Sequence, residues 1–209
     1  DMDGNAPEFN AIQISCLSEM ANIGVGHAAT AIAQMTNKPF QMSVPTVRSV
    51  ELEAIPLMVG AVEELTVGIY MPVDGDVPGH MAFLFPWRSA RAFWRLLLGQ
   101  APDSPEQIGE LEASVMLEVG NIMNSSFLNA ISEMCGLPIH ATPPLLAVEM
   151  AAAILQAIVL EATTTDSHAL SIETKVSCEE EQAEGYFLFI PTMGGLKRLF
   201  SSLGLPEVA

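Results

Sequence analysis

Cationic side chains are scarce in this sequence. Its 209 residues include 8 Lys and Arg against 25 Asp and Glu, so the formal net charge is −17 at pH 7. Nucleic acids are held by clustered cations that neutralise their phosphates, and anionic membrane surfaces attract the same clusters. The composition therefore argues against both nucleic acid and a membrane as partners.

Cysteine pairs and long apolar runs are also lacking. The three cysteines, Cys16, Cys135 and Cys178, are odd in number and form no Cys-x-x-Cys motif. We therefore expect a reduced, cytoplasmic protein. The longest apolar stretch, MAAAILQAIVL at 150–160, is too short to span a bilayer. It reads instead as a short amphipathic segment, used either for core packing, which we favour, or for docking a partner.

The usual motifs of self-contained catalysis are missing. The sequence has no His-Glu-x-x-His and no Gly-Lys-Ser/Thr phosphate loop, and nothing indicates a Ser/His/Asp triad. The four histidines are scattered, so we expect neither a metal site nor a cofactor of its own. They are His27, His80, His140 and His168.

An internal repeat is the main positive feature. A shift of 99 residues lays 15–45 on 114–144 without a gap, and a shift of 105 lays FLFP at 83–86 on LFIP at 188–191. The halves are then about 6–100 and 101–209. The identical pairs at the first shift are Ser15/Ser114, Glu19/Glu118, Asn22/Asn121, Ile23/Ile122, Ala31/Ala130, Ile32/Ile131, Met35/Met134, Pro39/Pro138 and Pro45/Pro144.

Each half predicts a long helix first. The first should run from about Pro7 to Thr36 and stop at Asn37, which tolerates the left-handed conformation. The second should be capped by Ser104, with Pro105 at its first position and Gln107 completing a capping box, and end at Gly136. Its core-facing residues should be Met116, Leu117, Ile122, Phe127, Leu128, Ile131 and Met134.

Each helix is followed by a short extended piece, a β-hairpin and a short amphipathic helix. The hairpins are 64–73 with 79–86, turning at Asp74-Gly75, and 168–177 with 185–190. We therefore predict an α+β fold: one internally duplicated, pseudo-twofold domain over 1–209. It should have a mostly antiparallel sheet with the two long, motif-bearing helices on one face.

A polar row recurs on both long helices. Ser15, Glu19 and Asn22 occupy positions i, i+4 and i+7, which share a helix face, and Ser114, Glu118 and Asn121 repeat the spacing. One interpretation is a solvated face inherited from a common ancestor. The other is function, because Asn is a weak helix former and its retention in both copies then has a reason. Periodicity alone leaves both open.

The chemistry of such a row suits completion of a partner's active site. A carboxamide donates and accepts at once, so it can fix one water molecule in a chosen orientation. In phosphoryl transfer, positioning the attacking water is much of the catalysis. A carboxylate on the same face can pair with a cation on the partner.

The repeated Ser-x-x-x-Glu-x-x-Asn pattern resembles the CheC / FliY / CheX phosphatases of bacterial chemotaxis, and CheC most closely. The strings EVGNIMNSSFLNAISEMCGLPIHATPP and SEMANIGVGHAATAIAQMTNKPF carry the resemblance. It implies dephosphorylation of a CheY-type response regulator that carries an aspartyl phosphate and its own Mg²⁺. Glu19 and Glu118 would reach a lysine of the regulator, Asn22 and Asn121 would orient the hydrolytic water, and Ser15 and Ser114 would be supporting.

The same resemblance leaves other functions open. It implies a CheD-like receptor deamidase as a further partner, so the chain could be a CheD-binding regulatory adaptor. A non-catalytic binding module like the middle domain of FliM is the other alternative, although that domain lacks the Glu/Asn pairs. We expect a monomer, because an internal duplication already supplies twofold packing.

Overall fold

Apart from η2 and α5, the described elements come in the same order twice. The computed structural model describes residues 9–49, 63–164, 170–178 and 183–206. In chain order the elements are α1 (Ala11–Thr36), β1 (Gln41–Met42), β2 (Thr46–Ser49), β3 (Leu65–Gly75), β4 (Gly79–Pro86), α3 (Trp87–Leu98), the 3-10 turn η2 (Pro105–Gln107), α4 (Glu110–Cys135), β5 (Ile139–Ala141), β6 (Leu145–Met150), α5 (Ala151–Thr164), β7 (Leu170–Cys178), β8 (Ala183–Pro191) and α6 (Met193–Ser202).

The strands form one antiparallel sheet in which the halves exchange partners. Its order is β1-β7-β8-β4-β3-β5, with β2 also on β7 and β6 also on β3. The short strands after α1 therefore pair with a second-half strand, and those after α4 pair with a first-half strand. Strands β4 and β8 meet at the centre. This symmetric order is what the predicted duplication would give; the duplication itself stays a prediction.

The register at the centre corrects the predicted alignment of the repeats on β4 and β8. Phe83 pairs directly with Phe187, and both lie in the same core cluster. A shift of 104 therefore matches FLF at 83–85 with FLF at 187–189, and it keeps each residue on its own face of the sheet. The predicted shift of 105 is wrong here, because side chains alternate along a strand and one residue of slip exchanges the two faces.

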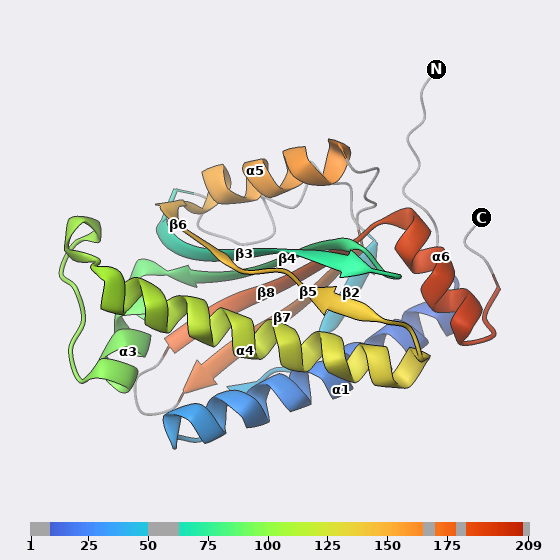
Figure 1. Ribbon diagram of the computed structural model, residues 1–209, viewed down its shortest axis with the longest axis horizontal. Coiled ribbons are helices and arrows are strands. Elements are labelled where there is room, and N and C mark those ends of the chain that lie inside the picture. The colour runs from blue at the N-terminus through green and yellow to red at the C-terminus, as the bar shows by residue number, and fades with distance from the viewer. Residues whose placement is uncertain (1–8, 50–62, 165–169, 179–182, 207–209) are drawn as a thin grey trace.

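The sheet is covered on both faces, so the molecule has three layers (Figure 1). Helices α1 and α4 lie on one face, where alternate β4 residues such as Phe83 and Phe85 are buried against them. Helix α5 lies on the other face over Ala82 and Leu84. The α+β prediction, with both long helices on one face, is confirmed. So is core packing of the 150–160 segment, since Ile154, Leu155 and Ile158 are buried.

Both predicted helix starts are wrong, whereas both ends are confirmed. Pro7 lies outside the described residues, but α1 begins only at Ala11, because Asn10 caps it. The predicted start of α4 at Pro105 is instead a single 3-10 turn, and the helix begins at Glu110. For α4, two N-cap positions five residues apart, Ser104 and Gly109, explain the error. Asn37 and Gly136 end the helices in the left-handed conformation.

Two smaller expectations also fail. Asp74 and Gly75 belong to β3 rather than to the hairpin turn, because β5 pairs with both of them and extends the strand. Two of the predicted core-facing residues do not face the core: Met134 is 36% exposed, and Leu117 lines a surface depression. Across the described ranges, no helix combines the length and the apolar character needed to cross a bilayer.

Candidate functional site

The two polar rows lie on neighbouring helices. Helices α1 and α4 run side by side over the sheet (Figure 1) and contact each other extensively. All six predicted side chains are exposed to solvent, as expected: Ser15, Glu19, Asn22, Ser114, Glu118 and Asn121. Within each row, Glu and Asn are about 4.5 Å apart along the helix axis, so one partner surface can contact both.

A reciprocal cap fixes the start of α1. The Asn10 side chain accepts a hydrogen bond from the Gln13 backbone N–H at 2.9 Å, and the Gln13 side chain accepts from the Asn10 N–H at 2.8 Å. Gln13 is buried and also donates to the Pro206 carbonyl at 3.0 Å. The helix carrying Glu19 and Asn22 is thus tied to the segment after α6.

Contacts with α3 and the α3–α4 connection fix the start of α4. The Glu112 carboxylate accepts from the Gly109 N–H at 3.0 Å, and the Glu112 carbonyl accepts from the buried Trp94 indole N–H at 2.9 Å. Arg91 pairs with Asp103 at 2.6 Å and donates to the Pro102 carbonyl. The axial position of Glu118 and Asn121 therefore depends on α3 as well as on α4.

Two glycines set how deeply the motif helices sit. A Cβ built on Gly120 of α4 would lie 2.5 Å from Ile69 Cγ2 on β3, and one on Gly24 of α1 would lie 2.6 Å from Phe127 Cδ2 on α4. Neither distance leaves room for a methyl group. Because Gly120 adjoins Asn121, its close approach to the sheet fixes the height at which that carboxamide stands.

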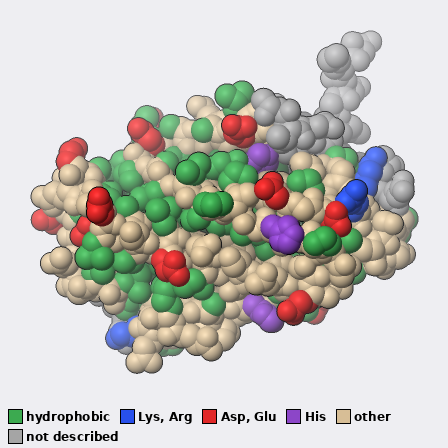
Figure 2. All heavy atoms as spheres, viewed as in Figure 1, with side chains coloured by type: hydrophobic (Ala, Val, Ile, Leu, Met, Phe, Trp, Pro, Cys, Tyr) green, Lys and Arg blue, Asp and Glu red, His purple; other side chains and the backbone are tan. Residues whose placement is uncertain are grey.

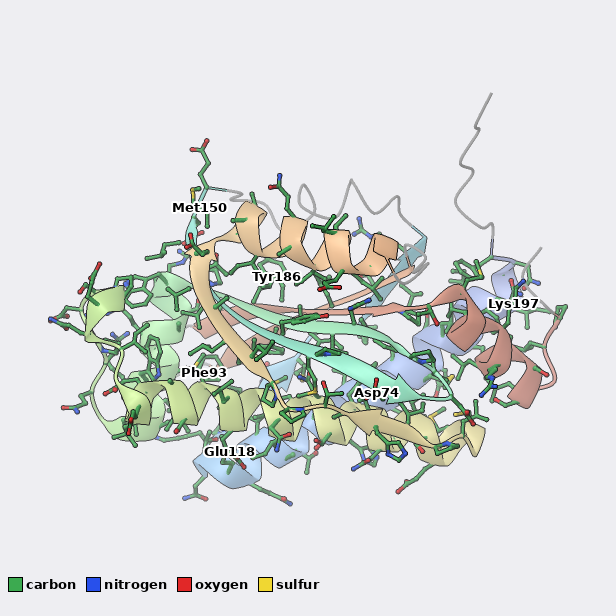
Figure 3. The ribbon with its side chains drawn as sticks, turned by 45° about the horizontal axis from the view of Figure 1, so that its top comes forward. Asp74, Phe93, Glu118, Met150, Tyr186 and Lys197 are labelled. Atoms are coloured by element: carbon green, nitrogen blue, oxygen red, sulfur yellow. The ribbon has the colours of Figure 1, made fainter. Side chains whose placement is uncertain are left out.

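The second motif lines a shallow depression of about 530 Å³. Its helix side carries Ser114, Leu117, Glu118 and Asn121, and its other side is the segment 141–144. Thr142 holds that segment against β3, since its N–H and its hydroxyl both donate to the Pro72 carbonyl, at 3.2 and 2.7 Å. In Figure 3, Glu118 projects from α4 on the side of the sheet opposite α5.

The first motif has different surroundings. A depression of about 410 Å³ on α1 lies toward its C-terminal end and is lined by Ala29, Thr30, Ala33, Gln34, Asn37, Pro39 and Phe40, without Glu19 or Asn22. Val44, the counterpart of Pro143 beside the second motif, is 80% exposed. The two polar rows are thus alike on their helices and unlike in the loops beside them.

The charge around the motifs is dispersed. On the face that carries α4, acidic side chains stand singly among hydrophobic and uncharged ones (Figure 2). In the part of the chain that the structure describes, no three His, Cys, Asp or Glu side chains gather closely enough to hold a metal ion. Each row therefore offers one carboxylate and one carboxamide on an open surface, and the second row borders a shallow depression. Such a surface cannot enclose a substrate, but its side chains can reach into the active site of another protein.

Two groups of polar residues were not anticipated. Asn124 on α4 is fully buried, and neither its Oδ1 nor its Nδ2 has a hydrogen-bond partner among the described residues. Its position within the apolar stripe of the helix is the sequence signal that could have identified it as a buried polar residue. Under α5, the Tyr70 hydroxyl lies 2.9 Å from His80 Nδ1. Burial lowers the pKa of His80 and raises that of Tyr70, with Glu161 acting as a second, upward influence on both.

Known proteins similar to this chain were found by sequence and by structure. The model of the CheC-like family matches residues 12–49. The chain is 29% identical over 203 residues to the CheY-P phosphatase CheC of Bacillus subtilis, covering 94% of this chain and 97% of that protein.

Solved structures share the fold at lower identity. FliY of Thermotoga maritima gives a TM-score of 0.72 at 17% identity, covering 94% of this chain and 98% of FliY. A chain of the CheX-CheY-BeF3-Mg+2 complex from Borrelia burgdorferi gives 0.56 at 16%, covering 81% and 95%. A chain of the FliG-FliM complex from H. pylori gives 0.65 at 9%, covering 90% and 99%.

Proposed function

We propose that this chain is a member of the CheC-like family, whose model matches residues 12–49, and a phosphatase of phosphorylated CheY-type response regulators. The observation that carries the proposal is the pair of exposed Glu/Asn rows on two packed helices, in a chain similar over most of its length to a CheY-P phosphatase. The fold alone gives weaker support for a phosphatase, because it is shared with a chain of the FliG-FliM complex.

In the proposed mechanism, Asn22 or Asn121 enters the regulator's active site and holds the attacking water. The carboxamide oxygen accepts one hydrogen of the water, and the amide N–H₂ donates to the water or to a phosphoryl oxygen. The water oxygen attacks phosphorus in line, and the bond between phosphorus and the aspartyl oxygen breaks. The products are the free aspartate, inorganic phosphate and a proton released to solvent.

Asn orients the attacking water and does not transfer a proton, because a carboxamide neither gains nor loses a proton near neutral pH. Holding reacting atoms in line replaces a rare encounter by a fixed geometry, and a misplacement of about 1 Å can cost a factor on the order of a hundred. The seating of α4 on Ile69 and of α1 on Phe127 supplies the rigidity that this positioning requires.

Glu19 and Glu118 have a binding role in the proposal. Each carboxylate pairs with a lysine of the regulator and sets the register of the Asn one helical turn later. Ser15 and Ser114, exposed on the same face, support the contact at its edge. The Mg²⁺ belongs to the regulator, where it offsets the negative charge of the phosphoryl group. The protein found in a complex with CheY, BeF3 and Mg+2 shares the fold of this chain, which is consistent with such a partner.

The test is the decay of a phosphorylated CheY-type receiver domain. We expect wild type to accelerate decay, each of Asn22→Ala and Asn121→Ala to lose part of that acceleration, and the double variant to lose it all. Asn129→Ala is the matched control, because it makes the same change at an exposed Asn two turns further along α4. If wild type binds receivers without accelerating decay, the chain is a non-catalytic or CheD-binding adaptor instead.

A further inference from the structure

Two large aliphatic side chains are exposed at matching places on the motif helices. Ile12 on α1 is 64% exposed and Leu111 on α4 is 57% exposed. They correspond under the 99-residue shift that relates the two polar rows. Each is the second residue of its helix, since α1 begins at Ala11 and α4 at Glu110.

Neither side chain is needed to start its helix. The capping contacts are made by the following residues, Gln13 in α1 and Glu112 in α4. Leaving an Ile or Leu side chain in water forgoes the stabilisation that its burial would bring. Other aliphatic side chains such as Leu160 are exposed as well, but these two recur at matching places on the two motif helices.

Both side chains lie in line with the polar rows. Leu111 comes seven residues before Glu118, which is two turns of helix, so the two differ by only about 20° around the axis. Along the axis, Leu111 is about 10 Å from Glu118 and about 15 Å from Asn121. Ile12 has the same relation to Glu19 and Asn22.

A protein large enough to engage Asn121 would also cover Leu111. A standard interface buries roughly 800 Å² on each partner, which corresponds to a disc with a radius of about 16 Å. Centred on Glu118, which lies between Leu111 and Asn121 in the row, this disc covers both, and centred on Glu19 it covers Ile12 and Asn22. An aliphatic side chain can anchor such an interface when it is buried in a pocket of the partner.

We propose that Ile12 and Leu111 are the apolar anchors of the two docking surfaces, each buried against a phosphorylated receiver domain. This inference rests on the proposed function, and it adds a recognition element that is separate from the Glu/Asn chemistry. The receiver must present an apolar patch beside its acyl-phosphate site, nearly three helical turns of this chain (about 15 Å) from the attacked phosphorus.

The test isolates one docking surface at a time. Asn22→Ala silences the first site, and Leu111→Gln is then added; Asn121→Ala silences the second, and Ile12→Gln is added. Gln is chosen because it is a good helix former of similar length, so the helix start is preserved. The control is Leu160→Gln, because Leu160 is 67% exposed on α5, across the sheet from the motifs. Leu111→Met should restore the wild-type behaviour.

We expect the half-saturating receiver concentration to rise about ten-fold with Leu111→Gln or Ile12→Gln, equivalent to about 1.4 kcal/mol, with an unchanged maximal rate. Because a receiver still binds a site that has lost its Asn, binding is measured with both anchors changed: Ile12→Gln/Leu111→Gln should bind a beryllium fluoride-activated receiver about ten-fold more weakly. If the half-saturating concentration and the binding affinity both match those of Leu160→Gln while the Asn variants still abolish activity, the proposed anchors are refuted. The proposed phosphatase activity is then supported without them. If Ile12→Gln/Leu111→Gln weakens binding although wild type shows no catalysis, the proposed anchors are correct and the proposed phosphatase activity is not.

Discussion

Replacing Gly120 by alanine should unseat α4 from the sheet. The added Cβ would lie 2.5 Å from Ile69 Cγ2 and 3.3 Å from Ile69 Cβ. Ile69 is fully buried and its Cβ is fixed to the backbone of β3, so the clash cannot be relieved by rotating a flexible chain end. Overpacking of this kind costs about 1–3 kcal/mol, against about 1 kcal/mol gained from the better helix propensity of alanine.

Gly26→Ala is the matched control for this substitution. Gly26 is exposed in the middle of α1, and a Cβ built there meets nothing within 4 Å. That variant should keep the propensity gain and be stabilised by about 0.5–1 kcal/mol. The two variants make the same chemical change in the two motif helices, so their difference of about 2 kcal/mol reports the contact with Ile69.

Urea unfolding followed by circular dichroism measures that difference. With a slope of about 2 kcal/mol per molar urea, the midpoint of Gly120→Ala should lie about 1 M below that of Gly26→Ala. Receiver dephosphorylation at the second site should fall with it, because Asn121 is the next residue. Equal midpoints for the two variants would refute the close seating of α4 on β3 and the account of how Asn121 is held.

Two further predictions concern polar groups inside the fold. Asn124→Val should raise the free energy of unfolding by about 1–2 kcal/mol, because the buried carboxamide lacks a hydrogen bond among the described residues. The matching position of α1 is the buried Val25, so a valine fits such a site. A loss of stability would show that Asn124 has a hydrogen-bond partner. Wild type should lose stability as the pH falls below about 6.5, because the unfolded chain binds a proton that His80, with its pKa lowered by burial, does not bind in the folded state. Urea midpoints between pH 7.5 and 5.5 should fall less steeply in His80→Gln, and an equal slope would contradict the lowered pKa.

Local chemistry allowed much of this structure to be predicted from the sequence. The residues that end α1 and α4 were identifiable because few residues tolerate the left-handed conformation, and Asn37 and Gly136 are two that do. The exposure of the polar rows followed from helical periodicity, since the apolar stripe lies on another face. These predictions depend on residues within a few positions of one another.

The features that escaped prediction depend on contacts distant in sequence. Strand β3 takes in Asp74 and Gly75 because β5, more than sixty residues later, pairs with them. The exchange of strands between the halves left no local signal, and neither did the hydrogen bonds from Thr142 to Pro72 that hold one side of the depression. The choice between Ser104 and Gly109 as the start of α4 likewise depends on Trp94 and Arg91 of α3.

The central claim is that Asn22 and Asn121 act on the chemical step, and one variant separates this from binding. The double variant Asn22→Ala/Asn121→Ala should bind a beryllium fluoride-activated CheY-type receiver nearly as tightly as wild type does. Its maximal rate of receiver dephosphorylation should drop by a factor on the order of a hundred. A double variant that binds normally and still dephosphorylates the receiver at the wild-type rate would contradict the account.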